Sequence, residues 1–191
     1  MLNRIRVVTM LMMVLVIFAL LQLISGGLFF SSLKQNQDSF AASNDLRMQQ
    51  SELTTTWDLM LQTRINLSRS SARMMMDPNN QQSSAKTELL KNARATLADA
   101  AKHYEAFKKI APQPAMAQAS ANIDEKYLAY FAGLTELVQF LEKGNMDAYF
   151  AQPTQGMQNA LGAALGEYAK ASGELYHSAF TQSQNDYRFA K

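Results

Sequence analysis

LRMQQSELTTTWDLMLQTRINLSRSSARM, residues 46–74, has the clearest periodicity in the chain. An apolar residue occupies every seventh position of this stretch, namely Leu46, Leu53, Met60, Leu67 and Met74. A stripe with this period is typical of a long helix that packs lengthwise against other helices. The wider segment 28–77 contains neither glycine nor proline, so nothing in it interrupts a helix. We therefore predict one long helix that ends near Asp77.

Three clusters of turn-forming residues divide the chain into four predicted helices. The clusters lie at 77–80, 111–114 and 144–153, and each contains proline. Apolar residues recur at helical spacing between them, without the alternation of a strand. We predict an all-α fold, an up-down-up-down antiparallel four-helix bundle preceded by one transmembrane helix. The inner faces of the last two helices are expected to include Ile123, Tyr130, Leu134, Leu161 and Phe180.

The N-terminal segment differs sharply in composition from the remainder. Residues 7–30 contain no charged side chain and, at about 1.5 Å rise per residue, form a helix long enough to cross a hydrocarbon core of about 30 Å. Arg4 and Arg6 precede this segment, so the positive-inside rule places residues 1–6 in the cytoplasm and residues 31–191 outside. We expect an uncleaved anchor. A cleaved signal peptide is the alternative, because small residues occur near the end of the apolar run.

The remaining residues carry little chemistry for catalysis. All 16 acidic residues lie beyond residue 30 and are balanced there by 16 of the 18 Lys and Arg, which argues against nucleic-acid binding. The chain has no cysteine, and neither His103 nor His177 has a partner at metal-ligand spacing. We therefore expect no enzyme activity, no cofactor and no metal site, and a bundle held together by packing alone.

Three arginines lie on the first predicted helix without an acidic neighbour. Arg64, Arg69 and Arg73 are the only charged residues between Asp58 and Asp77, so this interval carries +3 although the whole chain carries +2. Guanidinium groups that gather without carboxylates leave room for an external anion. The alternative interpretation is three ordinary solvated surface arginines.

The angular positions of the arginines favour a site shared by two chains. At about 100° per residue, Arg69 and Arg73 share one helix face, whereas Arg64 lies roughly 180° from Arg73. One helix cannot easily close all three around a small ligand, but two facing copies can. Arg64 of one chain would then meet Arg69 and Arg73 of the other, in a homodimer with two equivalent sites.

A second candidate recognition element is the segment 149–154, which we expect to be a short non-helical piece around Pro153. Its carbonyl groups need partners other than an i+4 amide, and a ligand ammonium or the Thr154 hydroxyl would supply them. Together with the arginines, this segment would accommodate a ligand that has both carboxylate and amino groups. An ordinary loop with its carbonyls in water is the alternative.

Three stretches of the chain resemble a known receptor family. They are NRIRVVT at 3–9, WDLMLQTR at 57–64 and YFAQPTQGMQNA at 149–160. These stretches resemble the enterobacterial aspartate chemoreceptors, which are methyl-accepting chemotaxis proteins, and the resemblance extends over essentially all 191 residues. It implies a homodimeric chemotaxis receptor whose periplasmic four-helix bundles bind L-aspartate at the subunit interface.

The resemblance also implies a ligand site, with the carboxylates on one group of residues and the ammonium on another. Arg64 comes from one subunit and the other carboxylate-binding residues come from its partner, whereas the ammonium contacts lie on the Arg64 side. The positions concerned are Arg64, Ser68, Arg69, Arg73, Tyr149, Gln152 and Thr154. Two sibling families keep similar arginines, the citrate sensors and the serine receptors, which typically have Asn where this chain has Ser68.

Further partners follow from the same resemblance. It implies a receptor in the bacterial inner membrane whose fourth helix slides inward on ligand binding, with negative cooperativity between the two sites. It also implies docking of maltose-binding protein at the membrane-distal tip. The family continues into a second transmembrane helix and a cytoplasmic part that contacts the kinase CheA and the adaptor CheW. We expect the 191 residues to be the sensory fragment of such a receptor.

Two interpretations from other classes remain open on the sequence. One is a membrane-anchored structural or adhesive bundle without a small ligand. The other is the sensor half of a membrane histidine kinase, which often uses a similar bundle.

Overall fold

The computed structural model describes the backbone of residues 2–77, 79 and 84–189, and the side chains of 10–77, 79 and 85–181. This described part of the chain is helical and contains no strand. Its elements are α1 (Leu2–Met76), α2 (Ser84–Lys109), the 3-10 helix η1 (Pro114–Met116), α3 (Ala117–Glu142), α4 (Met146–Ala151) and α5 (Thr154–Phe189). The chain divides into two units, residues 1–43 and residues 44–191, which are described separately below.

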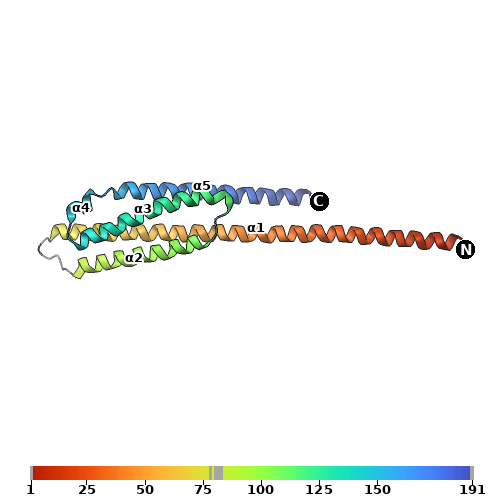
Figure 1. Cartoon of the computed structure of the whole chain (residues 1–191), viewed down its shortest axis with the longest axis horizontal. Helices are drawn as coiled ribbons and strands as arrows, with labels where there is room; N and C mark the ends of the chain where they lie inside the picture. The colour runs from red at the N-terminus through yellow and green to blue at the C-terminus, as the bar shows by residue number, and fades with distance from the viewer. Residues whose placement is uncertain (1, 78, 80–83, 190–191) are drawn as a thin grey trace. The chain divides into compact units, whose positions relative to one another are not determined.

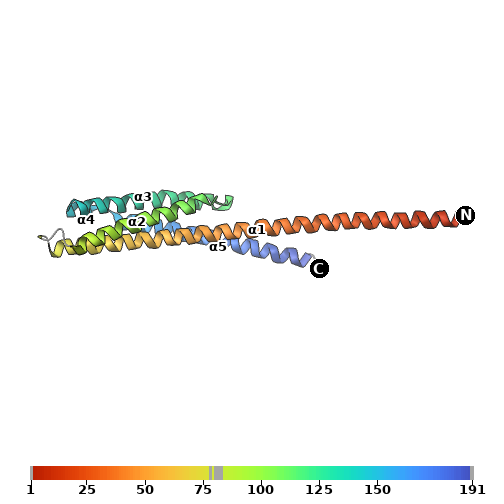
Figure 2. The same cartoon turned by 90° about the horizontal axis from the view of Figure 1, so that it is seen from below.

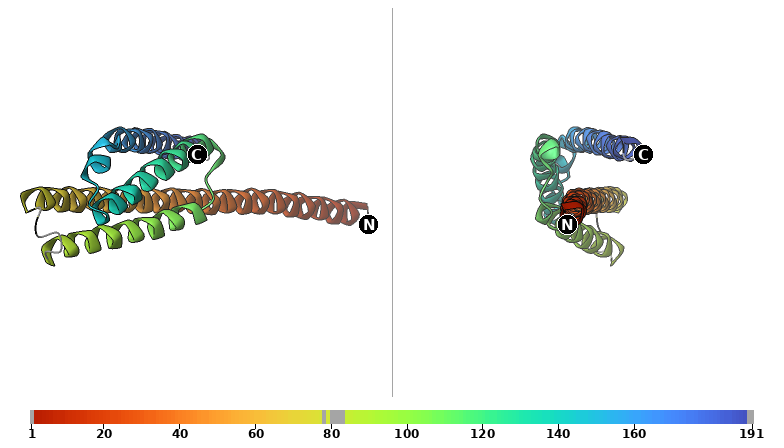
Figure 3. Two further views of the ribbon diagram at one scale, coloured as in Figure 1. Left: turned by 60° about the vertical axis from the view of Figure 1, so that its left-hand side comes forward. Right: turned by 90° about the vertical axis from the view of Figure 1, so that its right-hand side faces the viewer.

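The second unit is the predicted antiparallel bundle. Within it, α2, α3 and α5 run alongside the part of α1 that follows Asn44 and alternate in direction (Figure 1). The views in Figures 2 and 3 show the same four segments side by side from other directions. Residues 78 and 80 of the turn predicted at 77–80 lie outside the described part of the chain, whereas the turn at 111–114 is confirmed between α2 and η1.

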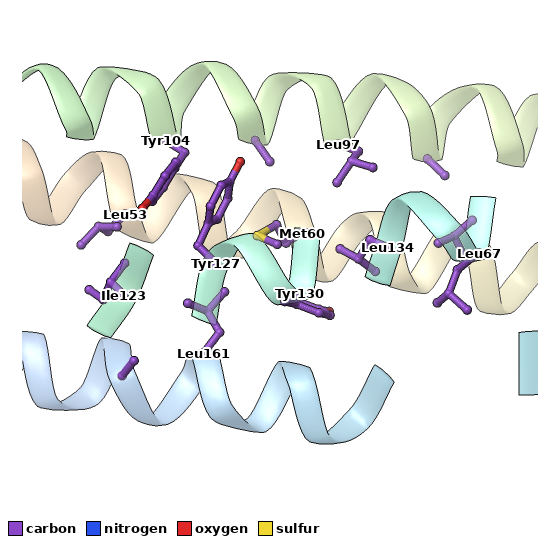
Figure 4. Packing of buried hydrophobic residues seen from close by; sticks show 14 of the residues in the cluster. Leu53, Met60, Leu67, Leu97, Tyr104, Ile123, Tyr127, Tyr130, Leu134 and Leu161 are labelled. Atoms are coloured by element: carbon purple, nitrogen blue, oxygen red, sulfur yellow. The ribbon is translucent and has the colours of Figure 1, made fainter. Parts of the chain in front are cut away.

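The heptad stripe of α1 is buried along its whole length, as its period predicts. Each of its five members is less than a tenth exposed, and they are Leu46, Leu53, Met60, Leu67 and Met74. Figure 4 shows three of them facing core residues of α2, α3 and α5. Tyr104 of α2 stacks on Tyr127 of α3 with ring centroids 3.5 Å apart.

The expected core residues Ile123, Tyr130, Leu134 and Leu161 are confirmed. Phe180 is 63% exposed, so its assignment to the core was wrong. It lies on α5, whose C-terminal part extends past the turn between α2 and α3 (Figure 1).

A second heptad series on α1 is polar and equally buried. Its members are Gln49, Thr56, Thr63 and Ser70. The Thr56 and Thr63 hydroxyls donate to backbone carbonyls four residues earlier on α1, each at 2.8 Å. Gln49 instead joins two other segments, because its amide donates to the Ile110 carbonyl at 2.9 Å and accepts from the Tyr168 hydroxyl at 2.9 Å. Gln49, Thr56 and Thr63 are accommodated in the core because their polar atoms have partners there, whereas the buried Ser70 hydroxyl has no hydrogen-bond partner among the described residues.

The connection between α3 and α5 is more helical than expected. Gly144 has φ 69°, and its N–H donates to the Leu141 carbonyl at 3.2 Å. The Asn145 N–H donates to the Phe140 carbonyl at 2.8 Å, which completes a Schellman motif at the end of α3. The Asn145 side chain then accepts from the Ala148 N–H at 3.1 Å and so caps α4.

The segment 149–154 was therefore predicted incorrectly as non-helical. Tyr149 lies within α4, and its N–H donates to the Asn145 carbonyl at 3.2 Å. Only Gln152 and Pro153 separate α4 from α5. The asparagine cap lets a six-residue helix form in what the sequence indicated was a loop.

Gly144→Ala and Gly166→Ala are expected to change stability in opposite directions. The first forces a side chain into a left-handed conformation, at a cost of about 1–2 kcal/mol. The second places alanine in the interior of α5, where nothing lies within 4 Å of the added Cβ, and should stabilise the helix by about 0.5–1 kcal/mol. Urea unfolding of the two variants, followed by circular dichroism, measures both changes. A Gly144→Ala chain as stable as the wild type would contradict the assigned Gly144 backbone, and destabilisation by Gly166→Ala would contradict the open space at that position.

The first unit consists of the N-terminal part of α1. Every described side chain from residue 10 to residue 30 is exposed. This helix is long and apolar enough to cross a membrane, with a mean hydropathy of 2.4 over its most apolar window. Because a signal sequence passes the same test, the anchor and its boundaries at residues 7 and 30 stay a prediction.

Candidate ligand-binding site

Arg64 is held at the bundle surface by side chains from two other helices. It is half-buried on α1, and its Nη1 donates to Oε1 of Gln158 on α5. The same Oε1 accepts from the Tyr130 hydroxyl of α3 at 3.1 Å. Tyr130 is fully buried and packs against Trp57 of α1, with ring centroids 6.3 Å apart. One amide oxygen thus joins three helices at the Arg64 guanidinium.

Burial of Tyr130 also fixes its protonation state. Removal of the phenol from water raises its pKa to about 12, although the charge and hydrogen bonding of Arg64 act in the opposite direction. The hydroxyl is therefore neutral at physiological pH and available as a hydrogen-bond donor to Gln158.

An open groove lies beside this cluster. It has a volume of about 440 Å³ and is lined by Leu61, Arg64, Ile65, Ser68, Arg69 and Gln158. Arg64 and Arg69 both border the groove, so the structure brings two of the predicted arginines and Ser68 together within one chain. Ile65 also lines the groove and is 52% exposed.

Arg73 lies one helical turn beyond Arg69 on α1 and is exposed, as is Arg69. The ion pairs found among the described side chains involve none of the three arginines. Arg64 has a neutral amide as its hydrogen-bond partner. This surface of α1 therefore carries three guanidinium charges that the described part of the chain does not neutralise.

The predicted ammonium contacts lie around the junction of α4 and α5. The Tyr149 carbonyl has no amide partner four residues on, because that residue is Pro153. The Gln152 carbonyl accepts from the Thr154 N–H at 2.8 Å. Thr154 is only 4% exposed, and its hydroxyl donates to Oε1 of Gln152 at 2.8 Å. Of these three groups, the Tyr149 carbonyl is the one whose i+4 residue cannot donate a backbone hydrogen bond, because proline has no N–H.

Glu136 of α3 orients this junction. Its carboxylate accepts from Nε2 of Gln152 at 2.6 Å, while Oε1 of the same amide accepts from Thr154. Thr154 and Gln158 lie one turn apart on α5 and hence on one helix face. The two halves of the predicted site therefore meet along the first turns of α5, next to Arg64.

Sequence reasoning missed Gln158, Glu136 and the hydroxyl function of Tyr130. Tyr130 was assigned to the core from its spacing. The spacing predicts that the ring is buried but does not indicate which group its hydroxyl contacts. Gln158 follows Thr154 at i+4, and this spacing was the one available indication that it lies on the face of the site. In the sequence, Glu136 is indistinguishable from any other exposed carboxylate on a helix. Its contact with Gln152 becomes visible only in the folded structure, where α4 and α5 lie next to α3.

A four-helix bundle with an unneutralised cationic groove on its surface belongs to the class of helical ligand-binding domains. Residues 1–174 match the family model described as "Tar ligand binding domain homologue". The chain belongs to this family. The resemblance to methyl-accepting chemotaxis proteins inferred from the three sequence stretches is thereby confirmed.

Relatives of known role agree with this membership. "Methyl-accepting chemotaxis protein I" of Escherichia coli (strain K12) is 38% identical over 189 residues, which are 98% of this chain and 34% of that protein. The "Methyl-accepting chemotaxis aspartate transducer" of Klebsiella aerogenes is 29% identical over 188 residues, 98% of this chain and 34% of the relative. The "Methyl-accepting chemotaxis citrate transducer" of Salmonella typhimurium is 28% identical over 191 residues, 97% of this chain and 34% of the relative. The chain thus spans about a third of the length of these relatives.

Proposed function

We propose that this chain is the sensory part of a transmembrane chemotaxis receptor and that it binds L-aspartate. The observation that carries the proposal is the set of three arginines on α1 without an acidic partner among the described residues, two of which border one groove. Guanidinium groups bind carboxylates bidentately and retain their charge at any physiological pH. A ligand with two carboxylates matches this surface better than a ligand with one.

The ammonium group of the ligand would bind at the junction of α4 and α5. Carbonyl groups at a helix C-terminus favour a cation, and the Tyr149 carbonyl lacks its helical amide. L-Aspartate offers two carboxylates and one ammonium, whereas citrate has no ammonium and serine has a single carboxylate. The choice depends on this charge argument, because the aspartate and citrate transducers are 29% and 28% identical to the chain.

A second copy of the chain would complete the site. Arg73 is not among the residues that line the groove of one chain, although its charge is equally unneutralised. The groove lining also exposes Ile65, which a facing helix would cover. We place the ligand between Arg64 of one subunit and Ser68, Arg69 and Arg73 of its partner, with Tyr149, Gln152 and Thr154 on the Arg64 side.

The cellular setting is proposed from the chemotaxis names of the relatives. Residues 7–30 would anchor the chain in the bacterial inner membrane, with residues 31–191 in the periplasm as the sensory domain. Ligand binding would displace α5 toward the membrane, and the full-length receptor would pass the signal to CheA and CheW. Maltose-binding protein is a second proposed input, at the membrane-distal tip.

Calorimetric titration of the full 191-residue chain in lipid nanodiscs tests the ligand assignment. We expect saturable binding of L-aspartate and weaker binding of L-glutamate, L-serine and citrate, each at the same pH and ionic strength. Preference for serine or citrate would overturn the choice of aspartate while leaving a receptor. Absence of binding of all four to a folded dimer would overturn the ligand-binding function itself.

A further inference from the structure

The hydrogen-bond partner of the half-buried Arg64 is a neutral amide. Oε1 of Gln158 accepts from Arg64 and from Tyr130 at once, so both donors converge on one oxygen. A neutral acceptor holds the guanidinium in place without cancelling its charge, which a glutamate at the same position would do.

We propose that Gln158 and Tyr130 are positioning residues that aim the Arg64 guanidinium into the groove with its charge intact. The inference depends on the proposed function, since an anion is what the aimed guanidinium would bind. The Tyr130 hydroxyl fixes the Gln158 amide oxygen, which in turn fixes Arg64, and the hydroxyl also interacts with Arg64 directly. A site whose charged side chain is held in advance binds its ligand with a smaller loss of side-chain entropy.

The location of Tyr130 makes this device rigid. The ring is fully buried between α1 and α3 and contacts Trp57. The hydroxyl is therefore held in one position and cannot move with the Gln158 amide. Gln158 is itself half-buried on α5. The position of Arg64 on α1 is therefore specified by α3 and α5, and a shift of α5 relative to α3 would move the guanidinium.

Gln158→Ala and Tyr130→Phe test the positioning role by calorimetry with L-aspartate. We expect either substitution to weaken binding by roughly 2- to 10-fold, the value of one ordered long side chain. The double variant should lose less binding free energy than the sum of the two single losses, because part of the effect of Tyr130 on Arg64 passes through the Gln158 amide. The control is Asn159→Ala, an exposed neighbour on α5, which should bind as the wild type does. Additive losses in the double variant would overturn the relay.

Gln158→Glu distinguishes positioning from simple packing. It keeps the size of the side chain but places a carboxylate on Arg64, so aspartate binding at pH 7.5 should fall by at least about 100-fold. Binding by this variant requires the introduced carboxylate to take up a proton, so the affinity of the variant for aspartate should rise as the pH falls from 8 to 5.

Among the described residues, the titratable groups that contact this position or line its groove are Arg64, Arg69 and Tyr130. The pKa of Tyr130 is about 12, so its titration does not reproduce the trend. A loss equal to that of Gln158→Ala, without pH dependence, would overturn the proposal.

A measurement without ligand separates this inference from the proposed function. Phenylglyoxal modifies accessible arginines, and mass spectrometry gives the rate at each site. We expect Gln158→Ala and Tyr130→Phe to accelerate modification of Arg64 several-fold, with Arg73 unchanged. Unchanged rates at Arg64 would refute the positioning role even if wild-type chain binds aspartate. Failure of wild-type binding with accelerated Arg64 modification would refute the ligand assignment and retain the positioning role.

Discussion

Arg64→Ala is expected to reduce L-aspartate affinity by at least about 30-fold, and Arg73→Ala by a similar factor. Removal of one partner of a hydrogen-bonded charge pair at an interface costs about 2–5 kcal/mol, and each 1.4 kcal/mol is a tenfold change in affinity. The prediction is more demanding for Arg73, which does not line the groove of its own chain. Calorimetry on the full chain in nanodiscs measures both losses.

The matched control is Arg47→Ala, because Arg47 is also an exposed arginine on α1. It should leave aspartate affinity unchanged and change stability by no more than about 0.5 kcal/mol. A full loss with Arg64→Ala and no loss with Arg73→Ala would contradict the three-arginine site. Equal losses in all three variants would indicate a general effect of charge.

Leu134→Ala is expected to have the largest effect on stability, and Leu128→Ala almost none. Both leucines lie on α3, but Leu134 is 0% exposed and Leu128 is 57% exposed. Truncation of a buried leucine costs about 2–5 kcal/mol through lost contacts and the cavity that remains. Truncation at the surface falls within about 0.5 kcal/mol.

Urea unfolding of both variants measures the difference, with an unchanged denaturant dependence as the sign that the native state is intact. Similar destabilisation of the two variants would show that α3 is rotated from the orientation described. A stable Leu134→Ala chain would contradict the common core of α1, α3 and α5.

The architecture was predictable because α1 repeats one apolar position over five heptads, and all five residues proved to be buried. The polar series Gln49, Thr56, Thr63 and Ser70 was not predictable from the same pattern. Hydropathy places threonine and glutamine outside, yet two of the threonines satisfy their hydroxyls on the carbonyls of their own helix. Spacing reveals which positions face inward only when the residues there are apolar.

The ligand site stays a prediction, and the local structure around it differs from the sequence-based expectation for identifiable reasons. The angular estimate separated Arg64 from Arg69, but long side chains reach around the helix, and both border one groove. The helix α4 was missed because six residues are too few to display a period, although Asn145 is a favoured cap. The role of Gln158 could not be read from sequence, because its partners come from α1 and α3.

A mixed dimer tests the central claim, a site shared between two chains, most directly. One chain carries Arg64→Ala and the other Arg73→Ala, each with its own affinity tag, and tandem purification isolates the mixed species in nanodiscs. In the shared geometry one site receives both substitutions and the other receives neither. We therefore predict one aspartate bound per two chains with wild-type affinity, although each homodimer has lost binding. A mixed dimer that binds no better than either homodimer would contradict the shared site, because sites contained within single chains would both be damaged.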